Sequence, residues 1–326
     1  MIIRPCVAAL GCLGFSITVG QCLAQTGAAA SYPVKPVRVL IGSPPGSGSD
    51  VMTRAVMQKL SDTLGQSLIA DNRPGAAGAI SLDMLANATP DGYTLGTISA
   101  QNVTGMVIKT VQVDIPKVLA PVTLMLSQPY LLVVNPVLPV ASVKEFIAYA
   151  RNKPVVYASS GVGTVVHLGM EMFKTMSGVD MTHVPYKGSG LSMIDLMGGR
   201  VQAAITNMLT AAPLVRSGKV RALAVTSPQR SPAMPDLPTV DESGIRGYEL
   251  RSWYGLVAPR NTPSVLVQKI NQSVGAAMAS PDVKERLAKD GAEAAPANSP
   301  EQFRALIAAD IVRWGNFVKA SGIKLN

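Results

Sequence analysis

The sequence predicts an α/β protein of two domains built on mainly parallel sheets. Short apolar runs typical of buried strands alternate with segments whose apolar residues recur at helical spacing, which is the pattern of strand–helix–strand layers. The 326 residues are 48% hydrophobic and 15% charged, which suffices for two domains and excludes a disordered or fibrous chain. In such sheets we expect ligands at the carboxyl ends of the strands.

The first strand and helix show the pattern most clearly. Val37–Ile41 is an apolar run, the loop 44–50 is rich in Pro, Gly and Ser, and apolar residues at helical spacing then continue to Leu64, where Gly65 ends the helix. The further expected strands are Leu68–Ala70, Tyr93–Ile98, Leu131–Val134, Val155–Ala158, Thr182–Val184, Val201–Ile205, Arg221–Thr226 and Gly255–Ala258. The further expected helices are Ile80–Ala88, Leu168–Met176, Leu191–Met197, Ser264–Ala279 and Pro300–Ala320.

Residues 1–30 have the pattern of a secretory signal peptide. Arg4 is their one charge, the apolar stretch Val7–Val19 follows it, and small residues precede two alternative cleavage points, after Ala24 or after Ala30. All three cysteines lie in this segment, so a mature chain would have no disulfide, thiol nucleophile or thiolate metal site. We therefore expect a periplasmic protein, with a lipoprotein anchor on one of these cysteines as the less favoured alternative.

The charge pattern argues against nucleic acid as a partner. The net charge is +9, but the cations are scattered singly and form no basic run. The uncharged stretch 118–143 is interrupted by four prolines, which favours short buried strands such as Leu131–Val134 over a membrane-spanning helix.

Motifs for catalysis and metal binding are absent from the sequence. His167 and His183 are its two histidines, neither has a metal ligand at a suitable spacing, and no nucleophile elbow or Walker loop occurs. We therefore expect no metal, no cofactor and no enzymatic activity. The alternative from another class is an exported serine hydrolase that uses Ser159 or Ser160 with His167.

Two loops of similar design are the candidate binding elements. Residues 44–50 and 159–164 each run from a strand into a helix start and combine glycines with hydroxyl side chains. A helix start presents unpaired N–H groups and the positive end of the peptide dipoles, which attract carboxylates. Two such starts facing each other across a cleft would bind a small diacid. The alternative is that their Ser and Asp residues merely cap ordinary helices.

A series of short motifs continues through nearly the whole mature chain in a characteristic order. They are Tyr32-Pro33, Pro44-Pro45-Gly46, Asn72-Arg73-Pro74-Gly75, Pro90-Asp91-Gly92-Tyr93-Thr94-Leu95, Tyr157-Ala158-Ser159, Thr182-His183-Val184-Pro185-Tyr186-Lys187-Gly188, Arg221-Ala222-Leu223-Ala224-Val225-Thr226, Arg230-Ser231-Pro232, Leu237-Pro238-Thr239-Val240, Ser252-Trp253-Tyr254-Gly255-Leu256 and Gly322-Ile323-Lys324. In these motifs the chain resembles the solute-binding receptors of tripartite tricarboxylate transporters, the Bug family.

The resemblance implies a two-lobed flytrap of the type II periplasmic-binding class with a two-crossing hinge. Lobe 1 would comprise residues 31–129 and 250–326, lobe 2 would comprise 130–249, and the hinge would lie near Gln128–Leu131 and Glu249–Trp253. Closure around the ligand would present a new surface to the membrane. The implied protein is a monomer that delivers a small organic acid to integral-membrane permease subunits. A ligand sensor for a membrane kinase, with the same fold, stays open.

The resemblance also implies which residues bind the ligand. The chain departs from the family in the first loop, at Gly42-Ser43 and Ser47-Gly48-Ser49, in the region 101–117 and at Thr206. Thr206 stands where many members have an aspartate, which favours plain carboxylates over amino acids, although which carboxylate is bound stays open. Trp253 is expected in the hinge core, and the alternative is that it covers the ligand. The implied substrate-binding residues are Pro45, Gly46, Ser47, Ser49, Asp50, Ser99, Gln101, Ser159, Gly161, Gly163, Thr164, His167 and Asn207.

Overall fold

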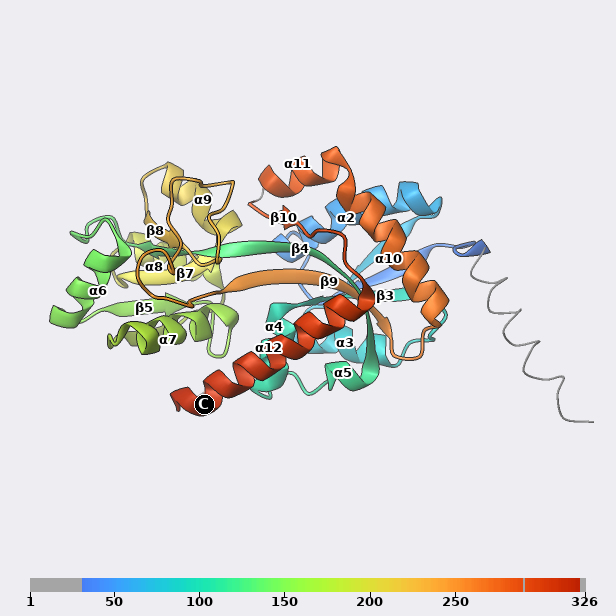
Figure 1. Ribbon diagram of the computed structural model, residues 1–326, viewed down its shortest axis with the longest axis horizontal. Helices are drawn as coiled ribbons and strands as arrows, with labels where there is room; N and C mark the ends of the chain where they lie inside the picture. The colour runs from blue at the N-terminus through green and yellow to red at the C-terminus, as the bar shows by residue number, and fades with distance from the viewer. Residues whose placement is uncertain (1–30, 290, 323–326) are drawn as a thin grey trace, which may run out of the picture.

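The computed structural model describes residues 31–289 and 291–322 and is shown in Figure 1. The predicted signal peptide lies outside these described residues. Within them, ten strands form a mixed sheet in the order β2-β1-β3-β9-β4-β7-β5-β6, and β8 and β10 each pair with β4. The strands are β1 (Val37–Ile41), β2 (Leu68–Asn72), β3 (Thr94–Ser99), β4 (Leu119–Val134), β5 (Val156–Ser159), β6 (Thr182–Pro185), β7 (Ala203–Asn207), β8 (Arg221–Val225), β9 (Arg251–Pro259) and β10 (Glu293–Ala294).

Helices cover both faces of the sheet. Where β1, β3 and β9 lie, α2, α10 and α11 are on one side, and α3, α4, α5 and α12 are on the other (Figure 1). The helices are α2 (Gly48–Leu64), η1 (Ala76–Gly78), α3 (Ala79–Ala86), α4 (Ala100–Val107), α5 (Ile115–Val118), α6 (Val143–Asn152), α7 (Val165–Ser177), α8 (Ser189–Met197), α9 (Met208–Arg216), α10 (Ser264–Ala279), α11 (Pro281–Lys289) and α12 (Pro300–Ser321).

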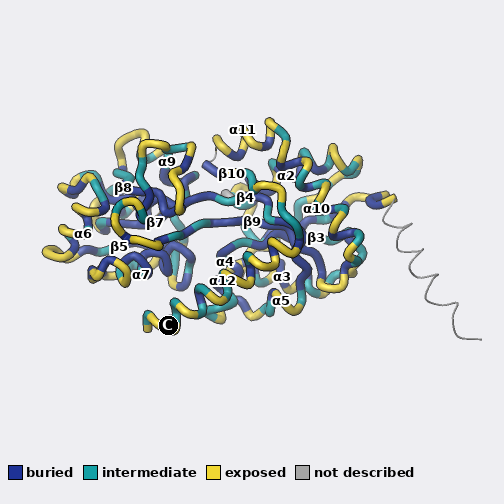
Figure 2. The backbone as a smooth tube through the Cα atoms, in the orientation of Figure 1, coloured by how far each residue is buried: buried dark blue, intermediate teal, exposed yellow. Residues whose placement is uncertain are grey.

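Strand β1 shows how the sequence produces these layers. Its side chains alternate between the two faces of the sheet. Val37, Val39 and Ile41 join the core beneath α2 and α10, whereas Leu40 joins a second core that includes Leu82 of α3. Figure 2 shows the strands buried in the middle of the molecule and the helices exposed on their outer surfaces.

The strand pairings confirm the predicted α/β fold with two lobes, but the sheet is mixed rather than mainly parallel, because β4 and β9 run antiparallel to their neighbours. Strand β1 pairs in parallel with β2 and β3, and β5 pairs in parallel with β6 and β7. The pairs that β4 makes are antiparallel: residues 119–129 pair with β9, and residues 130–134 pair with β7 and β8. We call the part around β1–β3 and β9 lobe 1 and the part around β5–β8 lobe 2. Strand β4 passes through both.

A buried threonine ties the two crossings together. Thr226 is fully buried, and its hydroxyl accepts a hydrogen bond from the N–H of Tyr130 at 2.8 Å and donates to the carbonyl oxygen of Leu250 at 2.7 Å. Its backbone bonds to both residues as well, at 3.0 and 2.8 Å. Both chain segments that connect the lobes are therefore fastened to one residue.

Candidate functional site

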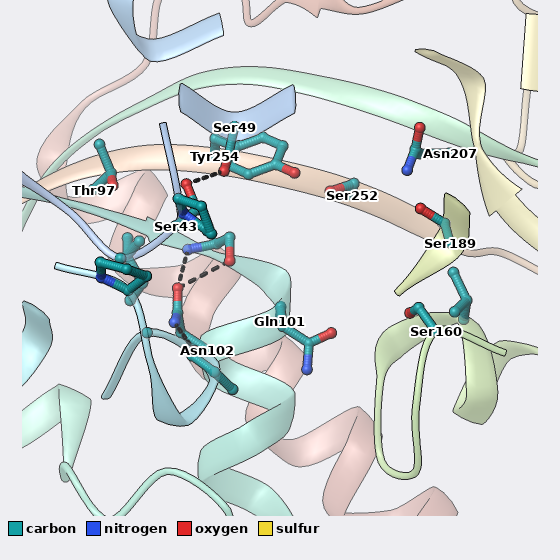
Figure 3. Close-up of a pocket in the computed structure, with 18 of the residues that line it drawn as sticks. Ser43, Ser49, Thr97, Gln101, Asn102, Ser160, Ser189, Asn207, Ser252 and Tyr254 are labelled. Atoms are coloured by element: carbon teal, nitrogen blue, oxygen red, sulfur yellow. Dashed lines mark hydrogen bonds between the residues drawn. The ribbon is translucent and has the colours of Figure 1, made fainter. Parts of the chain in front are cut away.

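A cavity of about 450 Å³ lies between the two lobes, beside the paired strands β4 and β9 that connect them (Figure 3). The crossing strands contribute Tyr130, Ser252 and Tyr254 to its wall. Lobe 1 contributes Gly42, Ser43, Pro44, Ser49, Pro74, Gly75, Ala77, Gly78, Thr97, Ile98, Ser99, Gln101 and Asn102. Lobe 2 contributes Ser160, Val166, Ser189, Ile205, Thr206 and Asn207.

The residues that line this cleft are all uncharged, and many offer a hydroxyl or an amide group. Burial raises the pKa of the Tyr130 and Tyr254 hydroxyls, so both keep their protons at neutral pH and can donate hydrogen bonds. Thr206 is 1% exposed, and its hydroxyl has no hydrogen-bond partner among the described residues. A buried polar group without a partner costs stability, so a ligand that bonded to Thr206 would recover that energy. The cleft therefore suits an anion held by neutral donors.

The first predicted loop is held in place by Asp50, which lies behind the cleft. Asp50 is 2% exposed and accepts hydrogen bonds from the Gly46 N–H at 2.9 Å, Arg54 Nε at 2.9 Å and Asn72 Nδ2 at 2.8 Å. Burial opposes ionisation of this carboxyl, but the hydrogen bonds from Arg54, Asn72 and Gly46 outweigh burial and hold its pKa below the usual range. Asp50 is therefore an anchor that shapes the loop.

Serine hydroxyls cover the cleft side of the same loop. The hydroxyls of Ser47 and Ser49 donate to Ser43 Oγ at 2.9 and 2.6 Å, and Ser47 also caps α2 by accepting from the Asp50 N–H. Ser43 and Ser49 line the cavity. The loop thus offers the cleft a cluster of neutral hydroxyls in front of a helix start.

The middle loop is supported from behind by both histidines. His167 and His183 stack with ring centroids 3.9 Å apart, and Tyr157 stacks on His183 at 4.9 Å. The Ser159 hydroxyl lies 2.7 Å from His183 Nε2, and His167 Nδ1 accepts from the Gly163 N–H at 3.0 Å. Burial lowers the pKa of both imidazoles, that of His183 to about 4. Both rings are therefore neutral at neutral pH and act as hydrogen-bond supports.

The structure brings four of the predicted site residues into the wall of the cleft. These are Ser49, Ser99, Gln101 and Asn207. The predicted residues that belong to the two loops but do not line the cavity are Pro45, Gly46, Ser47, Asp50, Ser159, Gly161, Gly163, Thr164 and His167. In the middle loop Ser160 lines the cavity, whereas Ser159 is 1% exposed. The binding roles of all these residues stay predictions.

Sequence reasoning missed the part of the wall made by the crossing strands. Ser252 and Tyr254 face the cleft, whereas Trp253 between them faces away, donating from its indole N–H to Asp310 Oδ2 at 2.6 Å and packing edge-on against Phe303. Because successive side chains of a strand point to opposite faces, the sequence could have assigned Ser252 and Tyr254 to one face and Trp253 to the other. That assignment needed a strand predicted from its true start at residue 251. The other cleft residues that were missed include Ser43, Asn102, Tyr130 and Ser189.

The described part of the chain contains neither a candidate membrane span nor a candidate metal site. No helix there is both long and apolar enough to cross a membrane. No group of three or more His, Cys, Asp or Glu side chains is placed to hold a metal ion within residues 31–289 and 291–322.

Two α/β lobes joined by crossing strands, with an uncharged cleft between them, define a two-lobed solute-binding protein. The sequence model of the tripartite tricarboxylate transporter family receptor matches residues 52–323, so the chain belongs to this family of receptors.

Named relatives agree with this assignment. The protein BugT of Bordetella pertussis is 35% identical over 317 residues, covering 94% of this chain and 97% of BugT. The structure of Rpa4515 from R. palustris with adipate has a TM-score of 0.80 and 37% identity and covers 90% of this chain and 99% of that chain. The structure of MatC from Rhodopseudomonas palustris with bound malate has a TM-score of 0.74 and 30% identity and covers 88% of this chain and 100% of that chain.

Proposed function

We propose that this receptor captures a small carboxylate, a di- or tricarboxylate or a related organic acid, in the cleft between its lobes and delivers it to a membrane permease. The observation that carries the proposal is the uncharged cleft lined by hydroxyl and amide groups. The relatives Rpa4515 and MatC, whose structures hold adipate and malate, support this ligand class. In the proposal the protein is exported to the periplasm by its first 30 residues and acts as a monomer.

The lobes would close around the ligand by bending at the two crossings. We propose that the lobes divide at 129/130 and 249/250. The change of β4 partners from β9 to β7 and β8 after residue 129 supports the first of these boundaries. The Thr226 contacts to Tyr130 and Leu250 hold both crossings at one point. A rotation of the lobes about this point is the hinge closure typical of two-lobed binding proteins.

Burial of Ser159 supports a receptor over the serine hydrolase. Ser159 lies beside His183 and is 1% exposed, so its hydroxyl is not open to a substrate in the cleft. Ser160, which does line the cleft, makes no side-chain hydrogen bond to either histidine within the described part of the chain, and a nucleophile needs a base within reach. We therefore propose that the protein is not an enzyme.

Thermal unfolding against a panel of carboxylates tests the receptor function. Adipate, malate and citrate are the probes, amino acids and sugars are the controls, and the protein is first unfolded and refolded to remove retained ligand. At 100 times its dissociation constant a ligand adds about 2.7 kcal/mol of stability. Absence of a shift with every carboxylate after refolding would contradict the proposal.

A charge placed in the cleft gives a sharper test. Asn207 caps α9 by accepting from the Thr210 N–H at 2.8 Å, and aspartate is an equally good cap. Asn207→Asp should keep the fold but repel a carboxylate, raising its dissociation constant at least about tenfold, or 1.4 kcal/mol. The matched control is Ser299→Asp, which changes the cap of α12 away from the cleft and should leave binding unchanged.

A further inference from the structure

One face of α4 reaches across the cleft. Gln101, in the first turn of α4, accepts a hydrogen bond through Oε1 from the N–H of Val165, the first residue of α7, at 3.1 Å. Figure 3 shows Gln101 extending from α4 between the two lobes. Ile108, the C-cap of α4, lies against Gly163, because a Cβ built on that glycine would come within 2.2 Å of Ile108 Cδ1. Residues seven apart share a helix face. Lobe 1 thus offers one polar and one apolar contact to lobe 2.

The surface that α4 meets is fixed from within lobe 2. The Gly163 N–H is held by His167 Nδ1 at 3.0 Å, and Thr164 Oγ1 donates to the Gly161 carbonyl oxygen at 2.8 Å. Gly163 has a φ of +73°, a conformation that favours glycine. The loop therefore takes its shape from contacts within its own lobe.

The helix that makes the contact is fixed from within lobe 1. Ser99 and Asn102 form a capping box at the start of α4, with the Ser99 N–H donating to Asn102 Oδ1 at 2.8 Å. Asn102 Nδ2 also donates to the carbonyl oxygen of Ala77 at 2.7 Å. Two surfaces, each held in shape by its own lobe, thus meet between the lobes.

We propose that Gln101 and Ile108 form a closure contact that holds the lobes together in the empty protein. The inference rests on the proposed receptor function only in that closure is what retains the ligand. An empty protein that spends more time closed binds more tightly, because the apparent dissociation constant equals the intrinsic constant of the closed form divided by the fraction of molecules that are closed. Gln101 and Ile108 are thus positioning residues, which set affinity through the balance of open and closed forms.

Distances between the lobes in ligand-free protein test this directly. Residues 31–326 contain no cysteine, so Asp62→Cys in α2 and Lys153→Cys after α6, both exposed, allow spin labels to be placed one on each lobe. Pulsed electron paramagnetic resonance on the refolded, ligand-free protein then gives the distribution of distances between the two spin labels. Gly163→Ala should shift this distribution toward open forms, because the new methyl group collides with Ile108.

Two variants separate the closure contact from backbone strain. Gly178 has a φ of +66° with nothing within 4 Å of its position for Cβ, so Gly178→Ala carries similar strain without a collision and should leave the distances unchanged. Adding Ile108→Ala to Gly163→Ala removes the collision partner and should restore closure in part. Gln101→Ala should broaden the distribution in the empty protein and weaken binding of whichever of adipate or malate shifts the wild type, by about 2- to 10-fold.

The proposal is overturned if the empty wild type and Gly163→Ala give the same distances, or if Gly178→Ala shifts them equally. It is also overturned if Ile108→Ala fails to counteract Gly163→Ala. Failure of the receptor function has a different signature: no carboxylate stabilises the wild type, while the distances still respond to Gly163→Ala.

Discussion

His183 should make this protein sensitive to mild acid. Its imidazole is stacked between Tyr157 and His167, and burial together with the neighbouring His167 and Lys174 lowers its pKa from 6.5 to about 4. In the unfolded chain His183 protonates near pH 6.5, whereas in the folded protein it stays neutral until about pH 4. The unfolded state therefore binds more protons in this window, and stability falls as the pH falls through it.

The size of the effect follows from the shift. Each pKa unit corresponds to 1.36 kcal/mol, so His183 removes up to about 2 kcal/mol of stability between pH 7.5 and pH 5 and up to about 3 by pH 4. These are upper values because the ring is partly exposed. Above about pH 7.5 the imidazole is neutral in both states and the contribution is flat.

His183→Phe isolates this contribution. Phenylalanine keeps a ring in the stack but does not titrate, and Ser159 Oγ keeps its hydrogen bonds with Gly161. The free energy of unfolding, measured by urea titration and circular dichroism from pH 7.5 to 5, should fall less steeply in the variant by up to about 2 kcal/mol.

A control keeps the imidazoles and perturbs the same cluster. Tyr157→Phe removes the hydroxyl that bonds to Glu171 but leaves both histidines, so its pH profile should run parallel to that of the wild type over this range. If the His183→Phe profile is equally parallel to the wild type, the reasoning is refuted.

Three more substitutions test the packing around the hinge and the loops by urea unfolding. Gly255→Ala should destabilise by about 3 kcal/mol or more, because its Cβ would come within 2.1 Å of Phe303; an unchanged midpoint would contradict the structure. Trp253→Phe removes the indole N–H that donates to Asp310 and should lower the free energy of unfolding by about 1–3 kcal/mol at pH 7. This loss should shrink as acid protonates the Asp310 carboxyl, because burial raises its pKa. Asp50→Ala removes the buried carboxylate that anchors the first loop and should cost about 1–3 kcal/mol, because Gly46 and Asn72 lose their acceptor while the half-exposed Arg54 stays solvated; a loss below about 0.5 kcal/mol would contradict the anchoring role.

Elements with a strong local pattern were predictable from the sequence. The strand Val37–Ile41 and the helix Ser264–Ala279 have the predicted bounds, because their apolar residues follow the period of the element and Pro or Gly residues mark the ends. The helices α4, α6, α9 and α11 were not predicted. They are 8–10 residues long, which gives the periodicity little length in which to show.

Strand β4 shows the opposite case. The sequence predicted only Leu131–Val134, because Pro121 and Pro129 suggested interruptions. In the structure the strand runs from Leu119 to Val134, and register shifts against β9 between Pro121 and Thr123 and between Leu124 and Leu126 accommodate the irregularity. Tertiary pairing overrode the local signal.

By itself the sequence determined the alternation of strands and helices, the family and the two loops that border the cleft. Only the tertiary structure decided which side chains face it. Ser160 lines the cavity while Ser159 turns to His183, and Ser252 lines it while Trp253 turns to Asp310. The physical reason is that the residue types in a loop, which the sequence gives directly, indicate what kind of ligand it can bind. The direction of each side chain depends instead on strand register and on partners distant in sequence.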